Sequence, residues 1–132
     1  MPKSLANLFH QGKFIFDLEG TLTFNAIKNS IVIDDEIRLI GGSLWKKFEF
    51  ITIKENSILM DNIIGDSIEY SVFQFSWDDG LPFLSIEGVQ DGSQWNDCFC
   101  VYECIKNEKL ILRNAKDGGG TYTYTVYKYS GK

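Results

Sequence analysis

Residues 121–127 read Thr-Tyr-Thr-Tyr-Thr-Val-Tyr, and this stretch decides the fold class. Successive side chains of a β-strand point to opposite faces, so Tyr122 and Tyr124 share one face and the threonines share the other. Just upstream, Leu110 and Leu112 alternate with other residues in the same way. Aromatic and β-branched residues favour strands. The two stretches therefore predict a closing β-hairpin with an apolar face of leucine and tyrosine side chains.

The same alternation continues along most of the chain. Short connections that contain Gly, Asn or Asp interrupt it, such as Asp78-Asp79-Gly80 and Asp91-Gly92. Connections of this kind favour hairpins between neighbouring strands. We predict an all-β fold, an antiparallel meander that closes into a barrel of roughly 8 to 10 strands. The predicted strands are 13–18, 20–27, 30–34, 36–41, 44–54, 57–61, 67–77, 81–88, 94–105, 108–114 and 120–130.

One short helix is predicted, at residues 3–10 near the N-terminus. Leu5, Leu8 and Phe9 would form its apolar stripe, and Gly12 would stop it. Residues 1–12 are then a helix or arm that packs on the sheet. A chain of 132 residues is long enough to bury a core, and we expect a single domain over residues 1–132.

The C-terminal part of the chain resembles a known family. Val101-Tyr102-Glu103-Cys104-Ile105 and Glu108-Lys109-Leu110-Ile111-Leu112, then a Gly-rich turn and residues 122–129, resemble the ending of small lipocalin-like domains of the calycin type. Gly12-Lys13-Phe14 is similar to the N-terminal G-x-W of that family, with Phe14 in place of tryptophan. The resemblance covers roughly the last 35 residues. It implies an antiparallel barrel with an apolar ligand in its mouth.

Residues 16–22, Phe-Asp-Leu-Glu-Gly-Thr-Leu, resemble the D-x-D-G-T-L loop of haloacid-dehalogenase phosphatases. Glu19 stands where that loop has its second aspartate. The parallel sheets of such enzymes need crossover segments of about a dozen residues or more, whereas no helices are predicted to alternate with strands here. Phosphatase chemistry is therefore not expected.

Charge and hydropathy narrow the classes of partner. Thirteen bases and 18 acids give a formal net charge of −5, which repels phosphate backbones and anionic lipid. No apolar run approaches the roughly 18 residues that a membrane-spanning helix needs. The N-terminus lacks the pattern of a secretory signal. We expect a cytoplasmic protein, unless a leader was trimmed from it, that binds neither nucleic acid nor membrane.

Cysteine and histidine are too few for most catalytic or metal sites. Cys98, Cys100 and Cys104 would share one face of an extended strand, where neighbours two apart seldom reach disulfide geometry. We expect free thiols that pack as small apolar groups. The single histidine, His10, is far from them in sequence, which disfavours a zinc site or a catalytic triad. We expect no metal, no cofactor and no enzymatic activity.

Aromatic residues make up 14% of the chain and support a binding hypothesis. Aromatic side chains line apolar pockets, and an arginine can orient a ligand carboxylate. The alternatives are that the aromatics simply fill the barrel and that the arginines pair with surface acids. We predict a non-enzymatic site for a small apolar or aromatic ligand. Its predicted residues are Trp45, Phe50, Phe75, Trp77, Trp95, Tyr122, Tyr124, Arg38 and Arg113.

The charge distribution supports a different function. Between Lys54 and Lys106 the chain has many acids but no lysine or arginine. An acidic face would speed association with a basic protein, although such a run is also typical of a solvated surface. The alternative is therefore an acidic protein-interaction domain of the inhibitor or immunity type. Its predicted partner-binding residues are Asp61, Asp66, Asp78, Asp79 and Asp91.

Two geometric expectations follow from the meander. The turns near residues 61–66 and near Asp91 should lie at one end of the barrel, with Asp78 and Asp79 at the opposite end. Several strands are apolar on both faces, so the outer face also has to be buried. Either the outer wall is covered within the chain, or the protein forms a homodimer through it.

Overall fold

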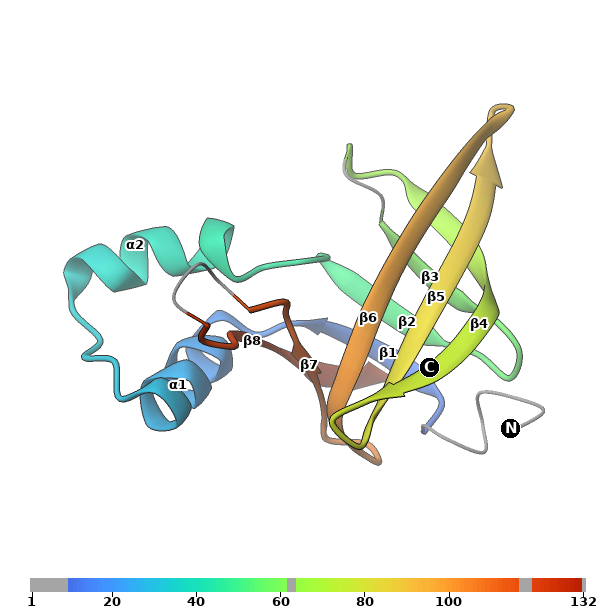
Figure 1. Cartoon of the computed structure of the whole chain (residues 1–132). Coiled ribbons are helices and arrows are strands. Elements are labelled where there is room, and N and C mark those ends of the chain that lie inside the picture. Colours follow the sequence, from blue (N-terminus) through green and yellow to red (C-terminus); the bar gives the residue numbers. More distant parts are fainter. Residues whose placement is uncertain (1–9, 62–63, 117–119, 132) are drawn as a thin grey trace.

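The computed structural model describes residues 10–61, 64–116 and 120–131. Their strands form a closed barrel in which each strand pairs antiparallel with the next and β1 pairs with β8 (Figure 1). The strands are β1 (Gly12–Phe16), β2 (Phe50–Ile53), β3 (Ile58–Asp61), β4 (Ser67–Asp78), β5 (Leu81–Gln90), β6 (Ser93–Ile105), β7 (Lys109–Arg113) and β8 (Tyr124–Gly131). Two helices, α1 (Leu18–Asn29) and α2 (Asp35–Leu44), lie between β1 and β2. The predicted all-β antiparallel barrel is confirmed.

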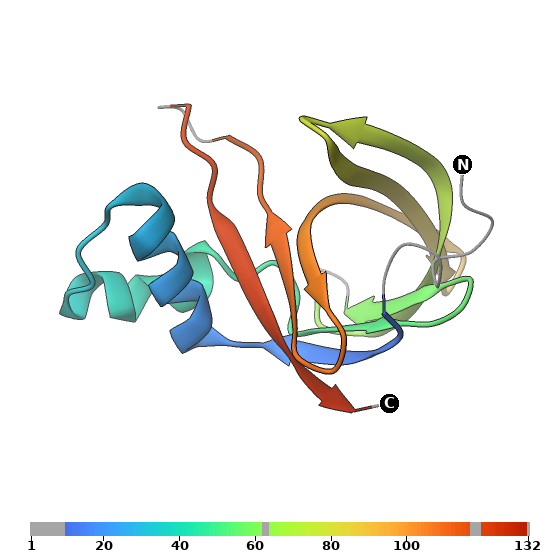
Figure 2. The same ribbon diagram turned by 90° about the horizontal axis from the view of Figure 1, so that it is seen from below.

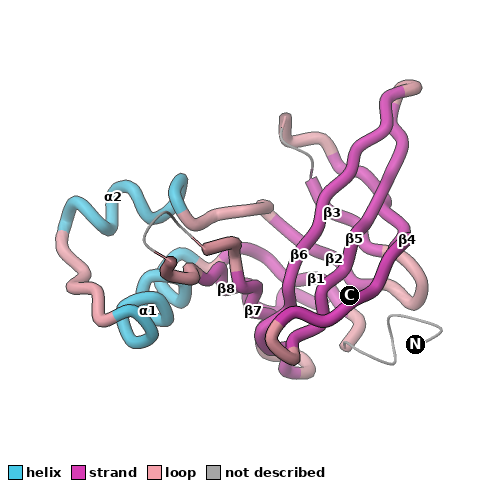
Figure 3. The backbone as a smooth tube through the Cα atoms, viewed as in Figure 1, coloured by secondary structure: helices cyan, strands magenta, loops and turns pink. Residues whose placement is uncertain are grey.

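The predicted strands between β1 and β2 are wrong. Residues 20–27 belong to α1 and residues 36–41 to α2, while residues 30–34 form no strand. Both helices lie on the same side of the barrel (Figure 1, Figure 2), and they interrupt an otherwise continuous series of strands (Figure 3). The helix predicted at residues 3–10 falls outside the described residues, except for His10, which is not helical.

The predicted hairpin turns are confirmed. Asp79 and Gly80 connect β4 to β5, and both have a positive φ, 54° and 79°. Asp91 and Gly92 connect β5 to β6 with φ values of 51° and 79°. Two-residue turns with two positive φ angles match the right-handed twist of the flanking strands, which is why Asp-Gly pairs favour them.

The interior of the barrel is a packed core. Alternate residues of the strands point inward and form one cluster of buried apolar side chains, as expected for a small barrel whose interior is just wide enough for side chains. Phe75, Trp95 and Cys104 are partly buried against this cluster. The cluster consists of Phe14, Phe48, Ile51, Ile53, Ile58, Met60, Ile68, Tyr70, Leu84, Ile86, Phe99, Val101, Leu110, Leu112 and Tyr127.

Helix α1 continues the hydrogen bonding of β8 beyond the end of β1. Asp17 caps the helix by accepting a hydrogen bond from Gly20 N at 3.1 Å. Polar side chains at every fourth position of the helix then bond to alternate residues of β8 and of the segment just before it. Four helical residues rise about 6 Å and two strand residues about 6.8 Å, so the two spacings match. The pairs are Val126 N with Thr21 Oγ1 (2.9 Å), Asn25 Nδ2 with Tyr124 O (2.8 Å), Tyr124 N with Asn25 Oδ1 (2.9 Å), and Asn29 Nδ2 with Tyr122 O (2.9 Å).

Helix α1 also covers the outer wall of the barrel at β7 and β8. Phe24 packs edge-on against Tyr124 and Tyr102, with ring centroids 5.1 and 5.6 Å apart. Ile111 and Val126 belong to the same outer cluster. The chain therefore covers this part of its own outer wall, and the homodimer stays a prediction.

A β-bulge in β6 changes which side chains face inward. The pairing of β6 with β7 shifts register between Val101 and Glu103. As a result Cys104 packs against the interior cluster, whereas Cys100 lies on the outer wall beside Arg113. The prediction that the three cysteines share one face is wrong. All three are free thiols, as predicted.

The prediction that the leucines and tyrosines of the last hairpin share one apolar face is also wrong. Leu110 pairs with Tyr127 and Leu112 with Thr125, and these positions face inward. Tyr124 instead belongs to the outer cluster. The hairpin itself is present as predicted.

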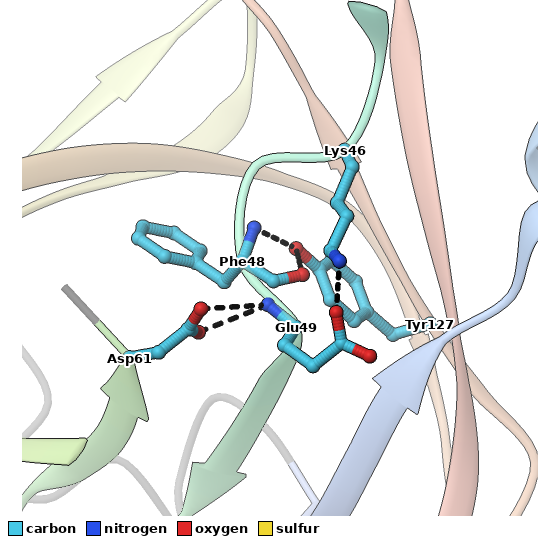
Figure 4. A network of polar contacts seen from close by, with 5 residues as sticks. All are labelled: Lys46, Phe48, Glu49, Asp61 and Tyr127. Atoms are coloured by element: carbon cyan, nitrogen blue, oxygen red, sulfur yellow. Dashed lines mark hydrogen bonds and ion pairs between the residues drawn. The ribbon is translucent and has the colours of Figure 1, made fainter. Parts of the chain in front are cut away.

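Residues 45–49 fill the end of the barrel at which β2 begins and β3 ends. Figure 4 shows the Tyr127 hydroxyl group pointing at the backbone of Phe48, where it accepts a hydrogen bond from Phe48 N at 2.8 Å and donates one to Phe48 O at 2.9 Å. The Asp61 carboxylate accepts from Glu49 N at 2.9 and 3.1 Å. Lys46 forms an ion pair with Glu49. These contacts hold the connection between α2 and β2 against the core.

Candidate binding pocket on the outer wall of the barrel

A pocket of about 300 Å³ lies beside the C-terminal end of β7. β6 pairs with β7 only from Cys100 to Ile105, so the part of β6 before Cys100 has no β7 partner. The pocket lies there, on the side of the wall to which Cys98, Cys100 and Arg113 belong. Its lining residues are Lys47, Asp78, Phe83, Cys98, Phe99, Cys100, Arg113, Asn114, Ala115, Lys116 and Tyr122.

Arg113 is the central charged residue of the pocket, and its side chain is only 6% exposed. Its Nη2 donates to Asp78 at 2.8 Å and its Nη1 to Asp79 at 3.4 Å. The guanidinium carbon lies 3.9 Å from the ring centroid of Tyr122, which is a close cation–π contact. Nε of Arg113 is buried and has no hydrogen-bond partner among the described residues.

The surroundings of Arg113 keep it charged. Burial alone would lower its pKa, but Cys100, Tyr122 and the two aspartates outweigh burial and raise the pKa. Burial raises the pKa of the Cys100 thiol, and the nearby Arg113 charge only partly offsets this. Burial also raises the pKa of Tyr122, against the opposing effect of Arg113. At neutral pH the pocket therefore contains a guanidinium beside a neutral thiol and a neutral phenol.

Two lysines add positive charge to the lining. Lys116 Nζ lies 5.0 Å from the ring centroid of Tyr122. Lys47 comes from the segment that fills the end of the barrel, and its Nζ lies 3.4 Å from Asp97. The remaining side of the pocket is mostly apolar, with Phe83, Phe99 and Cys100 in the lining.

The structure brings only part of the predicted ligand site together. Arg113 and Tyr122 are in contact and line the pocket. Tyr124 pairs with Arg113 across the sheet but packs under α1. Arg38 lies on α2, where it forms an ion pair with Glu19 of α1.

The other predicted aromatic residues are distributed over the barrel. Trp45 is buried, and its carbonyl accepts a hydrogen bond from the Thr125 hydroxyl group. Phe75 and Trp95 pack against the interior core. Phe50 lies beneath the Lys13 ammonium, and Trp77 is 60% exposed. These residues therefore do not form one site with Arg113.

The predicted partner-binding acids occupy both ends of the barrel, as expected for a meander. The β3–β4 and β5–β6 turns, which carry Asp66 and Asp91, lie at one end, and the β4–β5 turn lies at the other (Figure 1). Asp78 and Asp79 bind Arg113, and Asp61 binds the backbone of Glu49. These three acids are thus engaged within the chain. The protein-interaction function stays a prediction.

Sequence reasoning missed most of the pocket. Lys47, Phe83, Asn114 and Lys116 line it although no local motif marks them, because the closure of the barrel brings distant segments together. One signal was present: Arg113 follows Leu112 in an alternating strand, which places its charge on the face opposite the leucines.

Two further observations concern sites of other kinds. In the parts of the chain that the structure describes, no three histidine, cysteine or acidic side chains are grouped as a metal site. Within the same residues, no helix has the length and apolar character needed to cross a membrane.

Comparisons with protein-family models, curated proteins and solved structures find no match for this chain.

Proposed function

We propose that this protein is a non-enzymatic, lipocalin-like barrel that binds a small apolar or aromatic molecule. The observation that carries the proposal is the pocket beside Arg113, which combines an apolar lining with a buried cation and has a volume of about 300 Å³. Small-molecule sites are concave, mostly apolar and contain a few well-placed polar groups. An eight-stranded closed barrel is compatible with ligand binding.

The proposed site lies on the outer wall of the barrel, whereas the resemblance to lipocalin-like domains implies a ligand in the mouth of the barrel. The interior here is filled by side chains that pack in one cluster. A ligand would have to displace several of them, and each displaced large side chain costs on the order of 1.5–3 kcal/mol of burial. The pocket on the outer wall needs no such displacement. Binding there is therefore favoured over binding inside.

A neutral fluorescent probe tests the proposal. N-phenyl-1-naphthylamine is expected to bind saturably, with the rise in fluorescence that an apolar environment causes. Cys98 is exposed and lines the pocket, so Cys98→Phe is expected to fill the space and weaken binding by about tenfold or more, equivalent to about 1.4 kcal/mol.

Gln94→Phe is the matched control for this experiment. Gln94 is exposed and lies on the same strand an even number of residues away, so the new ring faces the same side but outside the pocket. The control should bind the probe like the wild type. Absence of saturable binding, or equal loss in both variants, would contradict the proposed function.

A further inference from the structure

We propose that β6 takes up an extended segment of a partner protein as an additional strand, along its edge from Ser93 to Phe99. The added strand would run antiparallel to β6, on the side where β7 pairs with β6 further along the sheet. In this mode of recognition the main chain of the partner supplies the hydrogen bonds. Such binding is separate from the small-molecule binding proposed above.

The edge of β6 lies where the barrel wall is incomplete. β7 pairs with β6 only from Cys100 to Ile105, so on that side residues 93–99 have no neighbouring strand among the described residues. Figure 1 shows β6 continuing beyond the end of β7. On the other side, β5 pairs with the whole stretch. An open edge presents unpaired N–H and C=O groups, which are a template for pairing with another chain.

The turn before β6 determines which backbone groups lie on this edge. In an antiparallel ladder, pairs that exchange hydrogen bonds alternate with pairs that do not, and the pair that closes a two-residue turn exchanges them. The register is regular from the Asp91-Gly92 turn onward, so the N–H and C=O groups of Gln94, Asn96 and Cys98 point away from β5. Cys98 N agrees with this, because it donates to the Asp97 carboxylate at 2.7 Å.

Gln94 and Asn96 leave their backbone groups available to another chain. In the described part of the chain, no backbone hydrogen bond from a further segment reaches either residue on this side. Their donors and acceptors repeat at every second residue, about 6.8 Å apart, and this is the spacing that another extended chain presents. The edge therefore fits a polypeptide strand better than a compact ligand.

The usual protection of an exposed edge is mostly missing here. Natural sheets protect their edges with lysine, proline or inward-pointing charges. Residues 93–99 contain neither lysine nor proline, and Asp97 is their one charged residue. Its carboxylate occupies Cys98 N and also contacts Lys47 at 3.4 Å. Gln94 and Asn96 are exposed and uncharged, so two of the three outward positions remain open to pairing.

Charge decides between a second copy of this chain and a different protein. Glu87 pairs with Asn96 across the sheet, Asp91 lies in the turn before β6, and neither β5 nor β6 contains lysine or arginine. A second copy would face these acids with acids of its own, and like charges on paired strands are destabilising. The occupant is therefore a different protein, whose strand is neutral opposite Gln94 and Asn96 and has a lysine or arginine near Asp91.

A peptide probe tests this inference. A randomised heptapeptide library displayed on phage is selected on the wild-type protein, and the most enriched sequence is synthesised with a fluorescent label. It is expected to bind saturably in an anisotropy titration. Because an antiparallel strand ends near the start of β6, its lysine or arginine should lie in the C-terminal half. Binding should weaken as salt rises.

Backbone methylation of the peptide distinguishes strand addition from other binding. A methyl group on an N–H that faces β6 removes a donor and collides with the edge, whereas the next N–H points away. Single methylations are therefore expected to weaken binding by about tenfold or more at alternate residues and to have little effect at the residues between them. Binding through side chains alone would show no such period of two.

Proline substitution removes a donor from the protein side of the same contact. Asn96→Pro deletes the N–H that faces the added strand while β5 loses no hydrogen bond, and proline is tolerated at such edge positions. It should weaken peptide binding by about tenfold or more, whereas Asn96→Ala, the matched control, keeps the N–H and should bind within about twofold of the wild type. Gln94→Pro provides a second variant if circular dichroism shows that Asn96→Pro does not fold.

The possible outcomes separate this inference from the proposed function. The inference is overturned if no peptide is enriched, if methylation has no alternating effect, or if the folded proline variants bind the peptide like the wild type. Dimerisation of the protein alone that the proline variants abolish in sedimentation would assign the edge to a second copy and also overturn it. If the peptide fails while N-phenyl-1-naphthylamine still binds, the proposed function stands; the reverse result removes the proposed function alone.

Discussion

Asn25 is the side chain whose loss should most clearly reveal how α1 is held to the barrel. It is fully buried, and its amide group makes both hydrogen bonds that a neighbouring strand would otherwise make with Tyr124: Nδ2 donates to Tyr124 O at 2.8 Å, and Oδ1 accepts from Tyr124 N at 2.9 Å. Nδ2 also donates to Thr21 O. Asn25→Ala removes all three contacts and leaves the backbone of a buried strand residue unpaired.

The size of the destabilisation follows from the two backbone groups of Tyr124, N and O, that lose their hydrogen-bond partners. Each buried donor or acceptor left without a partner costs about 1–3 kcal/mol, so Asn25→Ala should lower the free energy of unfolding by about 2–6 kcal/mol. Total stabilities are about 5–15 kcal/mol, so this is a large fraction. Asn29→Ala is the matched control, because Asn29 lies one turn further along and makes a single part-buried bond, to Tyr122 O. It should cost about 0.5–1.5 kcal/mol.

Urea unfolding followed by tryptophan fluorescence and far-ultraviolet circular dichroism measures both variants. The midpoint for Asn25→Ala should fall well below that of Asn29→Ala, with similar m-values if both unfold from the same compact state. Hydrogen exchange of the Tyr124 amide should accelerate in Asn25→Ala as well. The reasoning is refuted if Asn25→Ala costs less than about 1 kcal/mol, or no more than its control, with the m-value unchanged.

Three further predictions concern other parts of the molecule. Tyr127→Phe should destabilise by about 2–6 kcal/mol, because Phe48 N and O both lose their partner. Burial raises the pKa of Tyr127 above its ordinary 10.0, so the stability advantage of the wild type is full below pH 10.0 and declines at higher pH. Equal stabilities would contradict this. Glu69→Gln should destabilise at pH 7, since hydrogen bonds from Ser57 and Lys54 lower the pKa of Glu69; the difference should vanish as acid protonates the glutamate, and a difference that persists at pH 2 would argue against it. Iodoacetamide labelling, followed by mass spectrometry, should be at least about tenfold faster at Cys98 than at Cys100, because Cys98 is exposed while burial raises the pKa of Cys100. Comparable rates for the two thiols would contradict the burial of Cys100 in the barrel wall.

The strands from β4 to β8 could be predicted because their physical signals are local. Alternating side chains mark each strand, and Asp-Gly pairs adopt the two positive φ angles that the turns after β4 and β5 require. The faces of β6 could not be predicted, since the bulge after Val101 inserts one residue and reverses the alternation. Local pattern therefore determined the pairing of neighbours but not the direction of every side chain.

Helix α1 was missed for a different reason. Thr21-Leu22-Thr23-Phe24 alternates and is rich in residues that favour strands. The side of α1 that faces β8 includes the polar residues Thr21 and Asn25, because it completes a sheet edge, so a search for an apolar helical stripe does not find it. The available signal was Asp17 as a cap and polar residues at every fourth position.

The pocket was not predictable from any local pattern because it forms where the sheet is incomplete. β7 ends at Arg113, and beyond β1 the edge of β8 is completed by a helix. Asn29 at the end of that helix holds the backbone of Tyr122, and the ring of Tyr122 lies against Arg113 at 3.9 Å. The contact between Tyr122 and the buried Arg113 guanidinium is therefore supported by α1. The alternating pattern of residues 20–27 had predicted a strand in place of this helix. The aromatic stretch that reveals the fold class, residues 121–127, also places Tyr122 at the pocket, just before β8 begins, and there its ring covers the Arg113 guanidinium.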